Sequence, residues 1–111
     1  MAAEEVGARW LEAEGYAIVA RNVSSRWGEL DVVARDGDSL CFIEIKARAS
    51  PRFGTALAAV TADKQHRIAR AASAYLSRHP FDGPCRFDVL GMDADGEEWR
   101  FSLVRDAFVI G

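Results

Sequence analysis

The sequence has no apolar run near the roughly 20 residues that a membrane-spanning helix needs. Its first ten residues, MAAEEVGARW, lack the basic stretch and apolar core of a secretory signal. The cysteines and histidines do not have the spacing of a zinc site: Cys41, His66, His79 and Cys85. These absences predict a cytoplasmic protein with no membrane partner, no zinc and two reduced, buried thiols.

Other signatures of function are also missing. No glycine-rich phosphate loop is present, and the turn serines have no nearby histidine and aspartate to form a hydrolase triad. There are no internal repeats, linkers or low-complexity segments. With 111 residues, half of them apolar, the chain is predicted to form one domain, 1–111, with a core that needs no disulfides.

Hydrophobic periodicity and turn signals predict a mixed α/β domain in the order αβββαββ, with a helix available for each face of a five-stranded sheet. Thr61 or Asp63 is expected to cap the second helix, and His79-Pro80 to end it. Phe108 is expected to dock from a terminal turn. The predicted elements are helices at 2–14 and 62–78, a strand at 16–21, a two-stranded hairpin at 28–48, and later strands at 85–91 and 98–104.

The formal net charge is −3, but the charges are unevenly distributed. Residues 46–80 contain seven Lys or Arg and a single acid. This basic segment is compatible with a polyanionic partner, and equally with one helix that has a solvated basic face. Trp27, in a polar context, is expected to dock on the sheet edge or to stack on a base. The candidate nucleic-acid-binding residues are Arg48, Arg52, Lys64, Arg67 and Arg70.

The stretch from Gly28 to Arg48 carries ionisable pairs at strand spacing: Glu29 with Asp31, and Glu44 with Lys46. Side chains two apart on a strand share a face. The turn is expected either at Asp36-Gly37 or between Asp36 and an opposing Ser39. In both registers the carboxylates of Asp31 and Glu44 are direct or diagonal neighbours, with Cβ atoms about 5–8 Å apart.

Two carboxylates this close repel each other unless a positive charge joins them. A divalent cation, Mg²⁺ or Mn²⁺, would suit the oxygen donors, and Lys46 would then assist phosphodiester hydrolysis. The alternative is a salt-bridged sheet surface with a Glu29–Lys46 or Glu44–Lys46 pair. Glu4 can likewise face the sheet, or simply stabilise the first turn of its helix.

Several motifs together resemble the bacterial YraN-like protein family over essentially the whole chain. They are GYAI at 15–18, RN at 21–22, GELD at 28–31, ARDG at 34–37, FIEIKAR at 42–48, FG at 53–54, Val60 with Lys64 and Arg67, Ala72 with Tyr75-Leu76, and RFDV at 86–89. That family is similar to the restriction-endonuclease-like superfamily and to archaeal Holliday junction resolvases. The chain departs from the pattern in having no proline before Asp31, Ala47 where a threonine is usual, and no glycine upstream of Glu4.

The resemblance implies a restriction-endonuclease-like fold and a role for each acidic residue. Asp31 and Glu44 match the metal ligands, Lys46 the catalytic lysine and Glu4 the helix-borne acid, while Glu29 assists. It further implies a Mg²⁺- or Mn²⁺-dependent nuclease that acts on DNA, with branched or damaged DNA as candidate substrates and a homodimer as the expected assembly. The alternative is a nucleic-acid-binding domain of the same fold with little or no activity.

Overall fold

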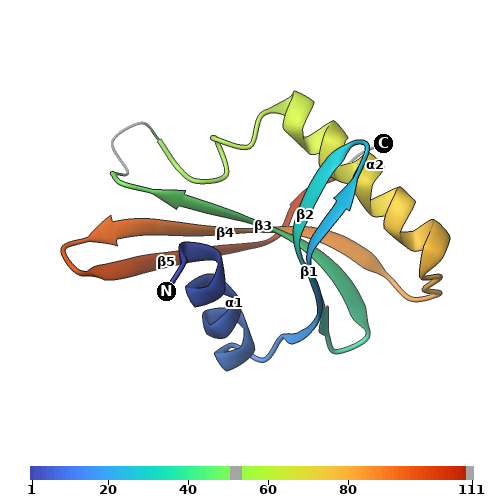
Figure 1. Ribbon diagram of the computed structural model, residues 1–111, viewed down its shortest axis with the longest axis horizontal. Helices are drawn as coiled ribbons and strands as arrows, with labels where there is room; N and C mark the ends of the chain where they lie inside the picture. The colour runs from blue at the N-terminus through green and yellow to red at the C-terminus, as the bar shows by residue number, and fades with distance from the viewer. Residues whose placement is uncertain (51–53, 110–111) are drawn as a thin grey trace.

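The computed structural model describes residues 1–50 and 54–109, in which two helices and five strands follow the order αβββαββ (Figure 1). The predicted α/β arrangement is therefore confirmed. The elements are α1 (Ala3–Ala13), β1 (Ala17–Ser25), β2 (Gly28–Asp36), β3 (Ser39–Arg48), α2 (Ala62–Arg78), β4 (Cys85–Asp95) and β5 (Glu98–Phe108).

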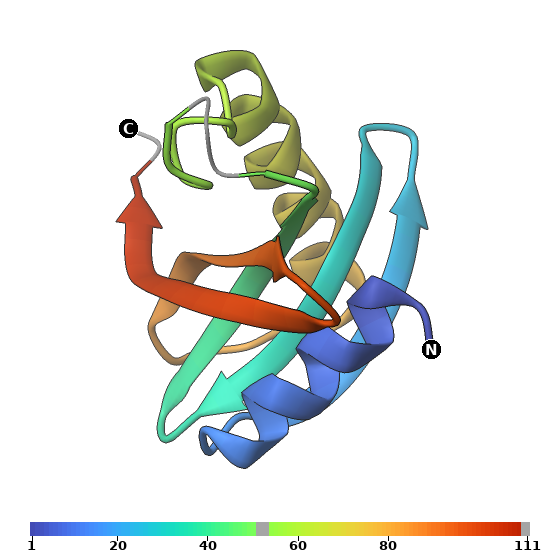
Figure 2. The ribbon, with the colours of Figure 1, turned by 90° about the vertical axis from the view of Figure 1, so that its left-hand side faces the viewer.

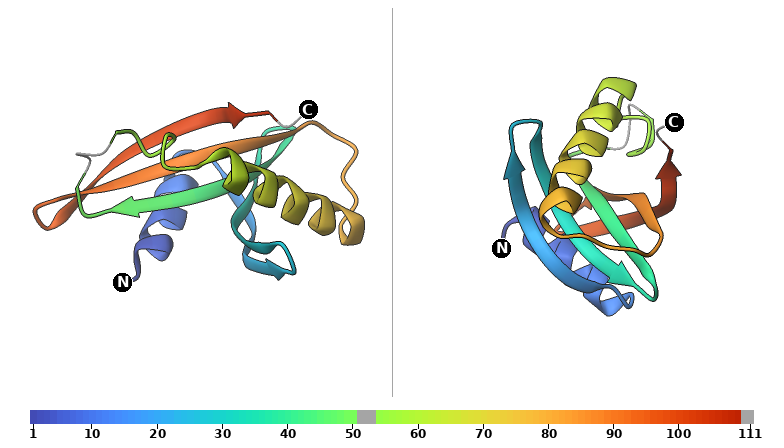
Figure 3. Two further views of the ribbon diagram at one scale, coloured as in Figure 1. Left: turned by 90° about the horizontal axis from the view of Figure 1, so that it is seen from above. Right: turned by 90° about the vertical axis from the view of Figure 1, so that its right-hand side faces the viewer.

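The strands form one mixed sheet in the order β1-β2-β3-β4-β5. Only β3 and β4 are parallel, and α2 makes the crossover that such a pair requires. The two helices cover opposite faces of the sheet: α1 lies in front of the strands in Figure 2, and α2 lies in front of them in the right-hand view of Figure 3. No described helix is long and apolar enough to cross a membrane.

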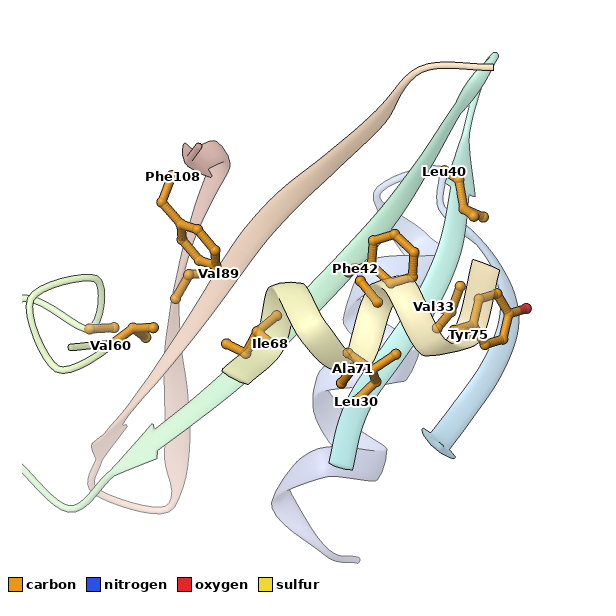
Figure 4. Packing of buried hydrophobic residues seen from close by; sticks show 12 residues of the cluster. Leu30, Val33, Leu40, Phe42, Val60, Ile68, Ala71, Tyr75, Val89 and Phe108 are labelled. Carbon is orange, nitrogen blue, oxygen red and sulfur yellow. The ribbon is translucent and has the colours of Figure 1, made fainter. Parts of the chain in front are cut away.

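Each face of the sheet has its own hydrophobic core. On the α2 face, Val33 and Phe42 pack with Ile68 and Tyr75 of the helix (Figure 4). The α1 face gathers the neighbouring positions of the same strands, Val32, Ala34, Cys41, Ile43 and Ile45, with Leu11. The alternation of side chains along β2 and β3 therefore buries both faces of the central strands.

Gly7 sets how closely α1 approaches the sheet. A Cβ atom at this position would lie 3.0 Å from Sδ of Met92 and 3.1 Å from Cδ1 of Ile45. The missing side chain therefore lets the helix backbone pack directly on β3 and β4. Glu4 lies one turn earlier, and its carboxylate is close to those of Glu29 and Asp31 on β2.

The boundaries of α2 agree with those expected from the sequence. The Thr61 hydroxyl accepts a hydrogen bond from the Lys64 backbone N–H at 3.2 Å, which identifies Thr61 as the N-cap. The helix ends at Arg78, two residues before Pro80.

Four sequence-based expectations need correction. Strand β4 extends to Asp95, past its expected end at residue 91, because it pairs with β5 as far as Asp95–Glu98. Strand β1 extends to Ser25, past its expected end at residue 21, because it pairs with β2 as far as Ser25–Gly28. Strand β5 extends to Phe108 where a terminal turn was expected; this ring is buried and stacks on Phe87 at 4.9 Å. Cys41 is buried as predicted, but the Cys85 residue is exposed at the start of β4.

Candidate functional site

The acidic residues of the GELD and EIK segments lie where the sheet divides. The pairing of β2 with β3 runs from Asp36–Ser39 to Val32–Ile43 and stops there. Beyond that point β2 remains paired with β1 as far as Gly28, and β3 remains paired with β4 as far as Arg48. Asp31 and Glu44 are the next residues along the two diverging strands. The turn is the one that places Asp36 opposite Ser39.

The Asp31 carboxylate lies at the fork, the point where β2 and β3 separate beyond the Val32–Ile43 pair. Its Oδ2 accepts a hydrogen bond of 2.8 Å from the Ile45 backbone N–H, which has lost its partner strand at this point. Burial, followed by the negative charges of Glu44 and Glu4, raises the pKa of Asp31 to about 7 against the opposing effect of that hydrogen bond. The fold therefore places this carboxyl group where its negative charge is disfavoured.

Three carboxylates from two elements meet beside this fork. One oxygen each of Glu4, Glu29 and Asp31 lies within 4.8 Å of the others. Glu4 comes from α1, on the opposite face of the sheet from α2, and reaches the other two at the fork. Asn22 bridges the cluster: with its amide nitrogen turned toward the acids, it donates to Glu4 Oε1 at 2.9 Å and to Glu29 Oε1 at 3.1 Å.

Glu44 is neutralised by a lysine from the helix. Glu44 is only 6% exposed, and its Oε1 lies 3.1 Å from Nζ of Lys64. The ion pair therefore links β3 to the first turn of α2. Sequence reasoning had placed Lys64 among the nucleic-acid-binding residues and had considered Lys46 as the partner for Glu44.

Lys46 lies two residues beyond Glu44 on β3 and is half-buried. Within residues 1–50 and 54–109 it forms no ion pair, so neither Glu29–Lys46 nor Glu44–Lys46 is present. The salt-bridged surface considered as an alternative is therefore not the observed arrangement. Among the described residues, Lys46 therefore has no acidic partner.

A pocket of about 300 Å³ opens over these groups. The acids Glu29, Asp31 and Glu44 line it from the strands, and Lys64 and Arg67 line it from α2. The basic helix therefore faces the carboxylates at its N-terminal end, a relation that the sequence alone left open.

The predicted nucleic-acid-binding residues fall into different environments. Arg48 makes a paired contact with Asp93, with Nε–Oδ1 at 2.8 Å and Nη2–Oδ2 at 3.1 Å, and it also donates to the Gly54 carbonyl. Both side chains of this pair are largely buried, so the arrangement is that of a structural ion pair. Arg67 and Arg70 are exposed residues of α2, whereas Arg52 lies outside the described part of the chain.

A second polar cluster lies within the protein and explains the RFDV motif. Asp88 has no exposed surface and accepts hydrogen bonds from Tyr16 Oη, Arg86 Nε and the Asp106 backbone N–H at 2.9–3.0 Å. Burial raises the pKa of Tyr16 to about 12, and the hydrogen bond to Asp88 contributes. Because its oxygens are held within the protein, we interpret Asp88 as a structural residue.

Asn22 is the site residue that sequence reasoning missed. The only signal was its place in the Arg21-Asn22 pair of the family motifs, since nothing local shows that an amide on β1 faces acids on β2 and α1. Its backbone adopts a positive φ of 53°, a conformation for which asparagine is several-fold enriched.

The fold and the pocket define a small α/β domain with carboxylates and a lysine gathered at a fork in its sheet. The chain belongs to the uncharacterised protein family UPF0102, whose family model matches residues 3–92. It is 48% identical to a UPF0102 protein of Symbiobacterium thermophilum over 110 residues, which cover 96% of this chain and 92% of the relative. It is 42% identical to the UPF0102 protein YraN of Escherichia fergusonii over 103 residues, or 90% and 76% of the two chains. The resemblance to the YraN-like family is thereby confirmed.

Proposed function

We propose that this protein is a Mg²⁺- or Mn²⁺-dependent nuclease that hydrolyses DNA phosphodiester bonds. The observation that carries the proposal is the convergence of Glu4, Glu29 and Asp31 at the fork, beside Glu44 and Lys64. Such a set of oxygen donors suits a hard divalent cation together with substrate phosphate. The likeness of the motifs to restriction-endonuclease-like enzymes gives independent support.

The residues present fit a divalent cation. Three carboxylate oxygens lie close enough to share one ion, and the pKa of Asp31 is raised because burial and neighbouring negative charge oppose its ionisation. A bound cation would reverse that electrostatic disadvantage and would activate water and polarise a phosphoryl oxygen. Asp31, Glu4 and Glu29 would hold the ion, with Glu44 next to them on β3.

The remaining site residues act on the substrate and on the proton. Lys46 carries no competing ion pair within the described residues, so its ammonium group is free to stabilise charge on the phosphate or to orient the attacking water. Lys64 holds Glu44 in place at 3.1 Å. Arg67, on the pocket rim, supplies positive charge for the DNA backbone.

Metal binding and chemistry are tested separately. Titration calorimetry with Mn²⁺ should give binding that is lost in Asp31→Ala, and unchanged binding in that variant would sink the metal assignment. Cleavage of junction, flap and linear DNA with Mn²⁺ should fall by at least about 100-fold in Lys46→Ala. Arg100→Ala, an exposed arginine paired with Asp95, is the charge-matched control.

The same assay decides between an enzyme and a binding domain. If the wild-type protein and Lys46→Ala both bind DNA and neither cuts it, the domain is a catalytically weak or inactive DNA-binding module. We also propose that the protein is a homodimer, as the resolvase likeness implies, and sedimentation equilibrium tests this directly.

A further inference from the structure

A second pocket lies directly beside the carboxylate pocket. It has a volume of about 370 Å³ and lies between the C-terminal half of α2 and the turn that joins β1 to β2. Trp27 and Ala71 line both pockets, so the indole and one turn of α2 separate them. In Figure 1 this turn rises next to α2. A ligand that occupies one pocket therefore extends naturally into the other.

The second pocket is positively charged, although the protein as a whole is acidic. Its floor is apolar and includes Val23 and Ala74. Arg26, Arg78 and His79 supply its ionisable groups, and no acid is among the described residues that line it. The carboxylate pocket, by contrast, mixes acids with bases. The second pocket is therefore suited to a ligand that combines an apolar, flat body with negative charge.

Aromatic and guanidinium groups supply flat surfaces for such a ligand. The guanidinium carbons of Arg26 and Arg70 lie 4.7 and 4.6 Å from the centroid of the Trp27 ring. The rings of Tyr75 and His79 lie 4.5 Å apart and both line the pocket; Tyr75 is buried, so the exposed His79 ring is the one that a ligand can reach. Nucleobases stack on both kinds of surface, because every base has a π-face.

The turn that carries Trp27 is held in place by its own hydrogen bonds. The Ser25 hydroxyl donates to the Gly28 carbonyl at 2.9 Å and accepts from the Trp27 backbone N–H at 3.1 Å. Gly28 has a φ of 114°, a conformation that residues with a side chain rarely adopt. The indole is thus positioned before any ligand binds, which lowers the entropy cost of binding.

The residues of α2 that line each pocket give the distance between the two pockets. Lys64, Arg67 and Ile68 line the carboxylate pocket, whereas Ala74, Tyr75 and Arg78 line the second. The two sets are about nine residues apart on average, which corresponds to about 14 Å along the helix axis. A nucleic-acid strand can cover this distance within a few nucleotides.

We propose that the second pocket binds an unpaired nucleotide of the DNA substrate, with its base displacing the Arg26 guanidinium from the Trp27 ring and its phosphate on Arg26 and Arg78. The inference rests on the proposed function, because the adjacent carboxylate pocket is what brings a DNA strand to this face. It specifies the substrate class: DNA with an unpaired nucleotide next to the site of cleavage. A base within a continuous duplex is stacked on its neighbours and cannot enter a pocket of this kind.

Binding in EDTA tests the proposal without requiring cleavage. Fluorescence anisotropy would compare a labelled duplex carrying one central unpaired thymidine with the same duplex fully paired, at fixed salt. Wild-type protein should bind the first about tenfold more tightly, the size of one base-stacking interaction. Arg78→Ala, at an exposed position, should reduce this ratio to near one, whereas Arg100→Ala should leave it unchanged.

A second probe reports where the base lies. With 2-aminopurine as the unpaired base, its fluorescence should be quenched on binding, and the quenching should be lost in Trp27→Leu. A ratio near one in the wild type would overturn the proposal, as would an unchanged ratio in Arg78→Ala. A protein with the preference but no Mn²⁺-dependent cleavage would refute the nuclease function alone. One that cuts paired DNA without the preference would refute only the pocket assignment.

Discussion

Replacing Asp31 by asparagine should stabilise the protein at alkaline pH in the absence of metal. The pKa of Asp31 is raised from 3.8 to about 7 by burial and by its acidic neighbours, so the folded state binds the proton more tightly than the unfolded state does. Stability from this group is therefore present at low pH and is lost as the pH rises from about 4 to about 7. Asparagine removes the charge and keeps an oxygen that can accept from the Ile45 N–H.

The magnitude follows from the size of the pKa shift. About three pH units correspond to roughly 4 kcal/mol as an upper limit, since each unit represents about 1.4 kcal/mol. Asp31 is only partly buried, and water screens part of its interaction with Glu4 and Glu44. We therefore expect Asp31→Asn to raise the free energy of unfolding by about 1–2 kcal/mol at pH 8.5, or the Tm by roughly 5–10 °C.

The assay is thermal and urea unfolding in EDTA at pH 4 and pH 8.5. The gain should be small at pH 4, where the carboxyl group is protonated in the folded state and close to half protonated in the unfolded state. Asp38→Asn, an exposed acid in the β2–β3 turn, provides the matched control and should not show this pH dependence. A variant less stable than the wild type at pH 8.5 would refute the electrostatic reasoning.

Metal should reverse the order of stability. At a Mn²⁺ concentration 100 times the dissociation constant, the wild type should gain about 2.7 kcal/mol, because the ion binds only the folded state. Asp31→Asn lacks a charged ligand and should gain much less. If the variant remains the more stable protein in saturating Mn²⁺, Asp31 is not a metal ligand.

Three further predictions concern ion pairs and packing contacts that stabilise the fold around the site and elsewhere. Lys64→Met should destabilise the fold by about 1–2 kcal/mol, because it leaves the buried Glu44 without its partner at 3.1 Å; a double-mutant cycle with Glu44→Gln should show coupling, and additive effects would contradict the ion pair. Gly7→Leu should push α1 away from Ile45 and Met92 and lower the free energy of unfolding by about 1–3 kcal/mol. Because this displaces Glu4, calorimetry should also show weaker Mn²⁺ binding. Unaltered Mn²⁺ affinity would show that Glu4 is not a ligand. Arg86→Met should cost about 3–5 kcal/mol in urea unfolding, because Asp88 has no exposed surface and would keep an unpaired charge; a loss below 1 kcal/mol would mean that Tyr16 and the Asp106 N–H suffice.

Local sequence signals were sufficient for most of the fold. Helix α2 begins after Thr61 and ends before Pro80, as the cap and breaker residues indicated. The strand limits were less well predicted. Polar residues at 22–25 concealed the continuation of β1, whose pairing with β2 satisfies its backbone. At the other end, burial of Phe108 against Phe87 extends β5 past its expected limit.

The candidate site was predictable in part. The spacing of Glu29 and Asp31, and of Glu44 and Lys46, indicated the acidic residues and the nearby lysine. The identity of the positive partner was not predictable, since Lys64 reaches Glu44 only after α2 packs on the sheet. Likewise, Arg48 was indistinguishable from the other arginines until β3 paired with β4, which brings it beside Asp93.

The sequence by itself determined the order of the elements, the side-chain alternation on β2 and β3, and the presence of acids at strand spacing, because each depends on neighbours within a few residues. Only the tertiary structure decided that the sheet divides at Asp31, that Glu4 reaches the acids on β2, and that Asn22 bridges them. The reason is physical: burial and repulsion between groups far apart in the chain exist only once α1 and the strands have packed together, and they produce the raised pKa of Asp31.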